Sequence, residues 1–324
     1  MGLKSLPLRG ICVISVISIF SYICKKNRTL HNTRSAMRNK ITAWIKAARP
    51  LTLSASFSPV LVGCTLAWRD GVFQPTAALL CLLVALTAQI ASNFANDYFD
   101  FKKGADREDR LGPVRAVASG QIAPEAMLRA TLITLGLACA AGCMLIPFGG
   151  WILLPVGIAM ALCVLAYSAG PFPLAYNGLG DVSVLIFYGI VPVCFTYYVQ
   201  ANTFSLLAVL LSVAVGLLSV NILVVNNYRD YEQDKISRKR TTIVLFGKRF
   251  GRILYLTNGL SALLLVSPLL SESPRHAVSF AVFLLLFILT WRQFCRLEGR
   301  ALNKILGQTS LLSLLFALIL MFIA

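Results

Sequence analysis

The chain has 324 residues, of which 57% are hydrophobic and only 13% are charged. Soluble domains carry about 25% charged residues, so this composition excludes an ordinary soluble protein and indicates one that crosses a membrane several times. The net charge of +17 is typical of cationic loops beside a membrane, and we expect no nucleic-acid partner. The nine cysteines lie mostly within apolar runs, which favours small core residues over a metal site.

Residues 1–40 form a basic and apolar extension, which we separate from a membrane domain over residues 41–324. An apolar run, Ile11–Cys24, lies between Lys4 and Lys25. It is shorter than the ~20 residues that cross a bilayer, and no cleavage site of small residues follows it. The run could be a tenth helix, an interfacial segment, a targeting sequence or part of a mis-assigned start.

Continuous apolar runs after residue 50 predict an all-α, polytopic membrane bundle of about nine transmembrane helices. The predicted spans are Leu51–Trp68, Ala77–Tyr98, Leu128–Phe148, Trp151–Tyr167, Val182–Val199, Leu206–Tyr228, Ile253–Leu270, Val278–Trp291 and Ile305–Ala324. Each is close to the length that crosses a bilayer, although the eighth is short.

The loops between these spans alternate in charge. Lysine and arginine gather before the first span and after the second, sixth and eighth, whereas the opposite loops hold only Arg69 and Arg275. The positive-inside rule places the cationic loops on the cytoplasmic side. We therefore expect a multi-pass protein of the inner, cytoplasmic membrane, surrounded by membrane lipid, with its active site facing the cytoplasm.

The pattern Asn-x-Tyr-x-Asp occurs twice, each time where a cytoplasmic loop begins. The first copy is Asn96-Asp97-Tyr98-Phe99-Asp100 and the second is Asn226-Asn227-Tyr228-Arg229-Asp230. Asp106 follows the first copy, and Asp234 lies four residues after the end of the second. Carboxylates are expensive at a membrane edge, so such clusters indicate a functional site. Oxygen ligands without His or Cys favour Mg²⁺ or Mn²⁺ over zinc.

Two such clusters facing each other would hold a diphosphate through bound metal ions. Basic residues beside both copies can neutralise the remaining charge: Lys102, Lys103, Arg107, Arg110, Arg115, Arg229, Lys239 and Arg240. A diphosphate site at a membrane edge, opening onto apolar helices, suits a polyprenyl diphosphate whose allylic bond is cleaved in a dry pocket. The simpler alternative, charges that merely alternate on a solvated loop, does not explain the duplicated spacing.

These residues resemble the UbiA superfamily of intramembrane prenyltransferases over roughly residues 40–324, and most of all its MenA type. The resemblance lies in three segments: Trp44 to Thr52, Asn93 to Gly120, and Asn226 to Thr241. It implies a bundle of nine helices around a central cavity. It also implies a first Mg²⁺ site, with Mn²⁺ as an alternative, and a second metal site; their ligands would be Asn96, Asp97, Asp100 and Asp106, and Asn227, Asp230 and Asp234, respectively.

The MenA resemblance implies transfer of a polyprenyl group from polyprenyl diphosphate to 1,4-dihydroxy-2-naphthoate. The carboxylate would leave as carbon dioxide, and the product would be demethylmenaquinone. Asp100, Asp230, Asn96 and Asn227 would carry the reaction. The residues that we expect to contact the diphosphate or the acceptor are Arg115, Lys102, Lys103, Arg229, Arg240, Tyr167 and Asp181.

One departure concerns the loop after the fourth span. Benzoate-type members often carry Tyr-x-x-x-Lys there, whereas this chain has Tyr167-Ser-Ala-Gly-Pro171 and no Lys or Arg before Asp181. This weakens 4-hydroxybenzoate as the acceptor, although homogentisate, 4-hydroxybenzoate and a tetrapyrrole alcohol stay open. Tyr167 either lines the acceptor pocket or is an interfacial aromatic, and Asp181 either caps a helix or orients the acceptor.

A cation transporter is a more remote alternative, because carboxylates can also bind transported ions. A transporter would place its coupling charges near mid-membrane, at broken helices. Here the carboxylates lie at predicted helix ends and are accompanied by cations, which favours the enzyme.

Overall fold

The computed structural model describes residues 38–105, 110–270 and 273–323. The chain divides into two compact units, Met1–Lys46 and Ala47–Ala324. Residues 38–46 of the first unit are helical. The apolar run Ile11–Cys24 and the predicted metal ligand Asp106 lie outside the described residues.

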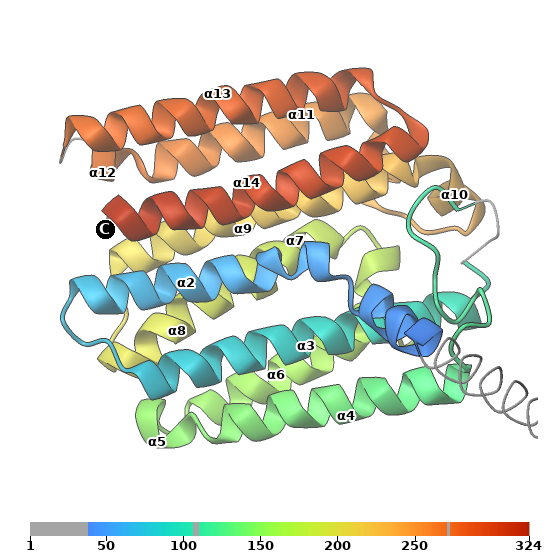
Figure 1. The fold of residues 1–324 in the computed structure, drawn as a ribbon, viewed down its shortest axis with the longest axis horizontal. Coiled ribbons are helices and arrows are strands. Elements are labelled where there is room, and N and C mark those ends of the chain that lie inside the picture. Colours follow the sequence, from blue (N-terminus) through green and yellow to red (C-terminus); the bar gives the residue numbers. More distant parts are fainter. Residues whose placement is uncertain (1–37, 106–109, 271–272, 324) are drawn as a thin grey trace, which may run out of the picture. The chain divides into compact units, whose positions relative to one another are not determined.

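The second unit is helical throughout its described part, where the only β feature is an isolated bridge between Asn177 and Arg240. Its long helices are α2 (Ser54–Arg69), α3 (Pro75–Lys102), α4 (Pro124–Cys143), α6 (Leu153–Ala166), α9 (Leu206–Arg229), α11 (Thr242–Leu265), α13 (Pro274–Arg296) and α14 (Leu302–Ile323) (Figure 1). A further continuous helical segment consists of α7 (Gly180–Leu185), the π-helix η3 (Ile186–Ile190) and α8 (Val191–Ala201). The short elements are η1 (Pro50–Thr52), α5 (Ile146–Gly149), η2 (Leu174–Tyr176), α10 (Tyr231–Ile236), α12 (Ser267–Leu270) and η4 (Gly299–Ala301).

Six helical segments in the described part of the chain are long and apolar enough to cross a membrane: Pro75–Lys102, Pro124–Gly149, Gly180–Ala201, Leu206–Arg229, Pro274–Arg296 and Gly299–Ile323. The remaining three predicted spans fall on α2, α6 and α11. The first two have 16 and 14 residues, and α11 carries Lys248, Arg249 and Arg252. The chain is therefore a multi-pass membrane protein, and the number of nine spans stays a prediction.

Several helices extend beyond their predicted bounds, and two of these extensions concern the motifs and their loops. α3 continues to Lys102, so the whole first motif is helical. α11 begins at Thr242 rather than at Ile253, because the Thr241 hydroxyl accepts a hydrogen bond from the amide of Val244 and caps the helix. The helix then kinks at Gly247, whose φ of 85° suits a residue without a side chain. Some of the basic residues that the sequence places in the loop after the sixth span, Lys248, Arg249 and Arg252, therefore belong to α11.

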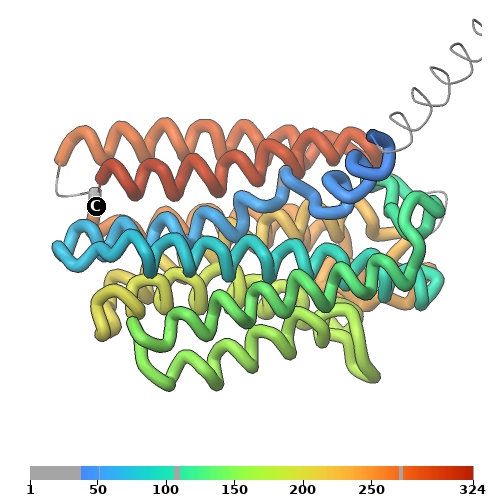
Figure 2. The backbone as a smooth tube through the Cα atoms, turned by 60° about the horizontal axis from the view of Figure 1, so that its bottom comes forward, coloured from blue at the N-terminus to red at the C-terminus, as the bar shows by residue number. Residues whose placement is uncertain are grey.

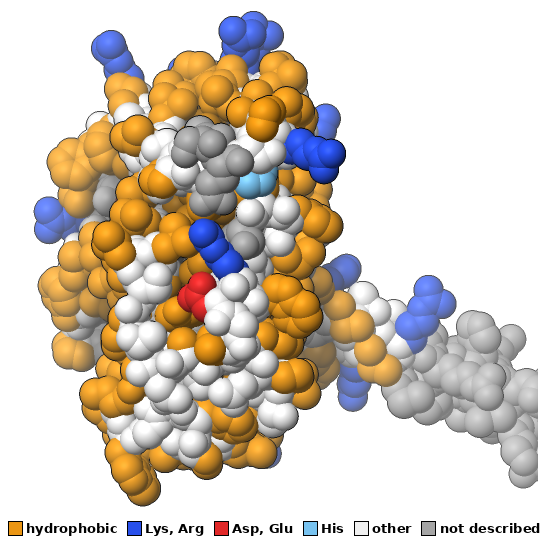
Figure 3. Space-filling view, turned by 90° about the vertical axis from the view of Figure 1, so that its left-hand side faces the viewer, with side chains coloured by type: hydrophobic (Ala, Val, Ile, Leu, Met, Phe, Trp, Pro, Cys, Tyr) orange, Lys and Arg blue, Asp and Glu red, His pale blue; other side chains and the backbone are white. Residues whose placement is uncertain are grey.

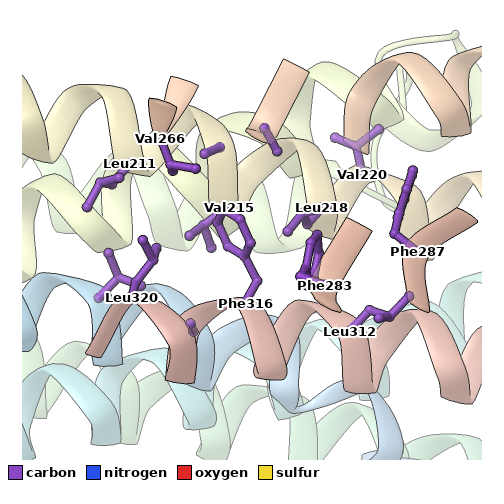
Figure 4. Packing of buried hydrophobic residues seen from close by; sticks show 14 of the residues in the cluster. Leu211, Val215, Leu218, Val220, Val266, Phe283, Phe287, Leu312, Phe316 and Leu320 are labelled. Carbon is purple, nitrogen blue, oxygen red and sulfur yellow. The ribbon is translucent and has the colours of Figure 1, made fainter. Parts of the chain in front are cut away.

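The helices pack in a continuous series of neighbours. α13 packs against α14 and α11, and both of these helices pack against α9 (Figures 1 and 2). α14 also packs against α2. α2 in turn packs against α3, and α3 packs against α4. Phe283 of α13 packs against Phe287 of the same helix and against Phe316 of α14, and Leu218 of α9 belongs to the same buried cluster (Figure 4). Because lipid is as apolar as these side chains, close packing rather than escape from water holds the helices together.

A pair of glycines allows the helical segment that contains the π-helix η3 to pack closely against α9. A Cβ on Gly189 of η3 would lie only 2.4 Å from the Cα of Gly216 on α9, so the two backbones touch. Such close approach is typical of membrane helices with small interfacial residues. π-helical turns often occur at functional sites, and here the turn brings Phe187 and Tyr188 to the wall of a cavity.

Both motifs lie at the same end of the second unit, where α3 ends and where α9 meets α10 (Figure 1). The opposite end of the helices is mostly hydrophobic or uncharged on its surface, with few charged groups (Figure 3). The helical arrangement therefore places the two acidic motifs together, as the alternating loop charges predict.

Candidate active site

A cavity of about 200 Å³ lies among the helices of the second unit. Its lining runs along α3 from Ala85 to Asp100, a rise of roughly four helical turns. The polar residues near the motif end are Arg49, Asn93, Asn96, Asp100, Arg115, Tyr167, Ser168, Asn226, Asn227 and Lys239. The apolar residues along the rest include Ala85, Ala88, Met160, Val164, Val184, Phe187, Ile222, Leu223 and Leu306. One end of the cavity is thus polar and the rest is mostly apolar.

Asp100 lies at the centre of the polar end. Its side chain is buried, and Oδ1 accepts a hydrogen bond of 2.8 Å from the hydroxyl of Tyr176. Oδ2 lies 3.3 Å from Nη2 of Arg115, which is also buried and lines the cavity. Hydrogen bonds to both oxygens fix the direction of the carboxylate.

Asp97, unlike Asp100 of the same motif, does not line the cavity. Its Oδ2 and Oδ1 accept hydrogen bonds from the backbone amides of Ala116 and Val117, at 3.1 and 3.2 Å. The buried carboxylate therefore anchors the loop that carries Arg115, and its predicted metal role stays a prediction. Asn96 lines the cavity and accepts a hydrogen bond from the hydroxyl of Ser168.

The second motif is organised by Arg229, whose side chain is 1% exposed. Nε and Nη2 donate to the two oxygens of the adjacent Asp230, both at 2.7 Å. Nη2 also donates to Oδ1 of Asn226, and Nη1 donates to Oδ1 of Asn303 at the start of α14. Arg229, predicted to contact the substrate, thus binds its own motif in this structure and does not line the cavity.

The loop after the first motif closes over the second. Arg110 Nη2 lies 3.7 Å from Oδ2 of Asp230. The carbonyl of Leu111 accepts a hydrogen bond of 3.0 Å from Nδ2 of Asn303. A Cβ on Gly112 would lie 2.6 Å from Nη2 of Arg229, so a side chain at this position would require the guanidinium to shift. Asn303 therefore links both motifs through its two amide atoms.

Asp234 lies one helical turn beyond Asp230, on α10, and its amide donates to the carbonyl of Asp230 at 2.8 Å. Burial raises the pKa of Asp234 to about 7; the nearby Asp230 and Asp100 carboxylates also raise it, whereas Lys239 opposes them. Burial lowers the pKa of Lys239, but Asp234 and Asp100 more than offset this and leave that pKa above its usual value. These mutual effects show that carboxylates of both motifs share one electrostatic environment.

The lysines and Arg240 divide into two groups by position. Lys239 lines the cavity, and the exposed Lys103 donates to the carbonyl of the cavity residue Ser168 at 2.6 Å. Lys102 is exposed, with its ammonium 5.9 Å from the ring of Tyr98. The side chain of Arg240 is exposed, and its amide donates to the carbonyl of Tyr176. None of Lys102, Lys103 and Arg240 lines the cavity, so their substrate contacts stay predictions.

Tyr167 and Asp181 lie where the main cavity meets a much smaller one of about 10 Å³. Tyr167 lines both cavities. Asp181 lines the small cavity, with Oδ2 accepting from the Thr242 hydroxyl and Oδ1 buried without a hydrogen-bond partner. The N-cap of α7 is Leu179, without a side-chain capping hydrogen bond, so the capping role considered for Asp181 is not observed. Its carboxylate bonds instead to Thr242 at the start of α11.

Residues 56–323 match the family described as the UbiA prenyltransferase family. The chain belongs to this family. The family resemblance read from the two motifs is therefore confirmed, as is the class of enzyme, a prenyltransferase.

Curated relatives and a solved structure extend the match. The chain is 39% identical over 218 residues to 1,4-dihydroxy-2-naphthoate octaprenyltransferase of Escherichia coli, covering 65% of this chain and 70% of that protein. It is 31% identical over 304 residues to the Haemophilus influenzae protein of the same name, covering 87% and 96%. A UbiA homolog from Archaeoglobus fulgidus, solved bound to DMAPP and Mg²⁺, has a TM-score of 0.61 at 15% identity, covering 87% and 99%. This last likeness shows a shared fold.

The site of this UbiA family member has donors suited to a hard divalent ion. Oδ2 of Asp234 is buried and accepts no hydrogen bond in this structure, so a carboxylate oxygen is left to bind a cation. The neighbouring donors are carboxylate and amide oxygens, which Mg²⁺ prefers. The described residues bring no three His, Cys, Asp or Glu side chains into a metal-binding group. Amide, water and phosphate oxygens would therefore complete the shell.

Several residues of the site in this UbiA protein were not singled out from the sequence. Tyr176 and Ser168 belong to the loop after α6 and touch residues of the first motif. Lys239, noted only as a basic neighbour, lines the cavity. Asn303 has no sequence signal, because its partners Arg229 and Leu111 lie 74 and 192 residues away along the chain.

Proposed function

We propose that this enzyme transfers a polyprenyl group from polyprenyl diphosphate to 1,4-dihydroxy-2-naphthoate, in a Mg²⁺-dependent reaction with loss of carbon dioxide. The product would be demethylmenaquinone, released in its reduced, quinol form. The observation that carries the proposal is the main cavity, which has oxygens of the first motif and Lys239 at one end and mostly apolar side chains along the rest, with Gln89 and several serines among them. Such a cavity matches a molecule with a charged head and a long apolar chain.

Asn96, Asp100 and Asn227 line the polar end and would hold Mg²⁺ together with the diphosphate; Asp234, which lies nearby without lining the cavity, would complete the set. The bound ion would neutralise charge on the leaving diphosphate and so assist its departure. Arg115 contributes a fixed positive charge, held against Asp100 at 3.3 Å. Preorganised charges of this kind stabilise developing negative charge without reorganisation at the moment of reaction.

Along the apolar part, side chains such as Ala88, Val164, Phe187 and Leu223 enclose the first isoprene units. When the allylic C–O bond breaks, its electron pair leaves with the diphosphate, and the remaining carbon is strongly electrophilic. Excluding water from this region keeps the electrophile for the aromatic acceptor. The new C–C bond forms at the ring carbon that carries the carboxylate, and the carboxylate departs as carbon dioxide and restores the aromatic ring.

The acceptor is supported by the relatives, because two proteins that cover 65% and 87% of this chain are named 1,4-dihydroxy-2-naphthoate octaprenyltransferase. Tyr167 and Asp181 would orient it. This role is supported by Tyr167, which lines both cavities, and by the buried Oδ1 of Asp181, which has no hydrogen-bond partner among the described residues, although Asp181 lines only the small cavity. Homogentisate and 4-hydroxybenzoate are the alternative acceptors. DMAPP and Mg²⁺, bound by the solved relative, support a prenyl diphosphate and a divalent metal here.

The proposed setting is the inner membrane, with the active site facing the cytoplasm. It is supported by the cationic loops, which lie at the motif end of the helices, and by the sparsely charged opposite end (Figure 3). Prenyl diphosphate would lie with its chain among the helices and its head at the cytoplasmic surface.

The test is turnover by the purified protein, given prenyl diphosphates of several lengths and each acceptor in turn, with and without Mg²⁺. We expect carbon dioxide and the prenylated naphthoquinol in equal amounts, only with Mg²⁺. Asp100→Asn should lose turnover by at least a hundredfold, because it removes charge from the metal and frees Arg115. Prenylation of homogentisate or 4-hydroxybenzoate in preference to the naphthoate would refute the assigned acceptor, and an unimpaired Asp100→Asn would refute the assigned site.

A further inference from the structure

The aromatic ring of Tyr176 lies beside two lysines that come from different motif loops. Nζ of Lys103, just after the first motif, lies 4.4 Å from the ring centroid. Nζ of Lys239, just after the second, lies 5.4 Å from it. Both distances fall within the roughly 6 Å at which an ammonium group is attracted to an aromatic ring. The two ammonium groups are close enough to repel each other electrostatically, so the ring offsets a repulsion between like charges.

Tyr176 is also bonded to both loops through its polar atoms. Its hydroxyl donates to Oδ1 of Asp100 at 2.8 Å. Its backbone carbonyl accepts from the amide of Arg240 at 3.1 Å, and the next residue, Asn177, forms a β-bridge with Arg240. One residue in the loop after α6 therefore contacts the end of α3 and the segment after α10.

The positions of the lysines suit a phosphate group at the polar end of the cavity. Lys239 lines the cavity, and Lys103 donates to the carbonyl of Ser168, whose hydroxyl bonds to Asn96. The loop from Tyr167 to Asp181 contains no Lys or Arg. Apart from Arg49, the cations that line this end of the cavity come from the two motif loops. Lys103 and Lys239, one from each loop, meet at the ring of Tyr176.

We infer that Tyr176 is a positioning residue that holds Lys103 and Lys239 as a pair of diphosphate-binding cations and aligns Asp100 beside them. The inference rests on the proposed function, because it names the residues that bind the diphosphate of the prenyl donor. Lysine has four rotatable bonds, so a side chain already held on a ring loses less conformational freedom when it binds a phosphate. The ring and the hydroxyl of Tyr176 have separate roles. The ring positions the two lysines through cation–π contacts, and the hydroxyl positions Asp100 through a hydrogen bond.

The test separates the two roles with two variants of the full-length protein. Tyr176→Phe keeps the ring and removes the hydroxyl, and Tyr176→Leu removes both. The probes are geranyl diphosphate and inorganic pyrophosphate, each titrated in the presence of Mg²⁺ to obtain a dissociation constant, followed by turnover. We expect Tyr176→Leu to weaken both ligands about tenfold, the size of effect expected for contacts between a ring and two cations. Tyr176→Phe should keep both dissociation constants within about twofold and lower kcat, because the ring stays beside the lysines while Asp100 loses the hydrogen bond from the hydroxyl.

Two controls distinguish positioning from a general loss of structure. Lys235→Met removes a lysine that lies 4.9 Å from the ring of Tyr231 in the same region but does not line the cavity. It should leave binding unchanged. Lys239→Met should weaken pyrophosphate, and adding Tyr176→Leu to it should cost less than in the native chain, because the two changes act through one contact.

A series of phenylalanines with increasing ring fluorination at position 176 keeps the shape of the side chain and weakens only the attraction for cations. Stepwise weaker pyrophosphate binding along this series would support the inference even if Tyr176→Leu failed to fold. Equal binding along the series, or a Tyr176→Leu protein that binds pyrophosphate as well as Lys235→Met does, would overturn it. If the native protein binds geranyl diphosphate but does not prenylate the naphthoate, the proposed acceptor fails while the role of Tyr176 stands.

Discussion

Replacing Gly112 by alanine tests whether the two motifs are locked together. The new Cβ would lie 2.6 Å from Nη2 and 2.9 Å from Cζ of Arg229, closer than real Cβ contacts. An exposed arginine would move aside at little cost, but Arg229 is held by both oxygens of Asp230, by Asn226 and by Asn303. Displacing it removes at least one buried hydrogen bond between charged groups, a loss of about 1.5–3 kcal/mol. If the substitution destabilises the transition state of the reaction by this free energy, turnover falls roughly ten- to a hundredfold, since 1.36 kcal/mol is a factor of ten in rate.

The assay is prenyl transfer at saturating substrate, with thermal unfolding of the purified protein measured in parallel. Gly136→Ala is the matched control, because a Cβ at Gly136 meets no atom within 4 Å, and alanine favours a helix over glycine by about 1 kcal/mol. Gly112→Ala should be slower and less stable than this control. If the two variants have the same turnover and unfolding temperature, Arg229 is free to move and the reasoning about the interlocked loops is wrong.

Three further predictions follow from single contacts. Asp234→Asn should raise the Mg²⁺ concentration needed for half-maximal turnover by about tenfold or more. The reason is that Oδ2, which is buried without a hydrogen-bond partner, would no longer belong to a carboxylate. An unchanged Mg²⁺ titration would show that Asp234 is not a metal ligand. Gly189→Ala should destabilise the protein by about 1–3 kcal/mol, because the Cβ would lie 2.4 Å from backbone of Gly216, whereas Gly142→Ala has open space and should be neutral. Asp97→Asn should speed amide hydrogen exchange in residues 115–120, because an amide side chain can accept only one of the two backbone hydrogen bonds there; native exchange rates would show that the carboxylate does not hold this loop.

The two motifs could be read from the sequence because their residues are close together along the chain. Asn96 and Asp100 are four residues apart, and helical geometry alone puts them on one side of α3. The same spacing also contains Asp97, whose carboxylate points to the loop amides of Ala116 and Val117 instead of lining the cavity. Spacing thus identifies a cluster of carboxylates, but it does not say which oxygens are already used by hydrogen bonds.

Arg229 shows the same limit for a cation. A basic residue inside an acidic motif suggests an anion-binding role, yet its guanidinium is bonded to Asp230, Asn226 and Asn303. Lys239, which the sequence offers as one cation among many in its loop, reaches the cavity. The direction of a long side chain depends on neighbours from other helices, and those neighbours are not local in the sequence.

Composition and the alternation of loop charge determined that the chain crosses a membrane several times, because both reflect the free energy of placing side chains in hydrocarbon. The repeated motif determined the family and the oxygen-rich chemistry, because its residues are fixed by local helical spacing. Only the tertiary structure decided which residues share one site. Asn303, Tyr176 and Gly112 act through partners on other helices, and close packing, rather than any local pattern, brings those partners within contact distance.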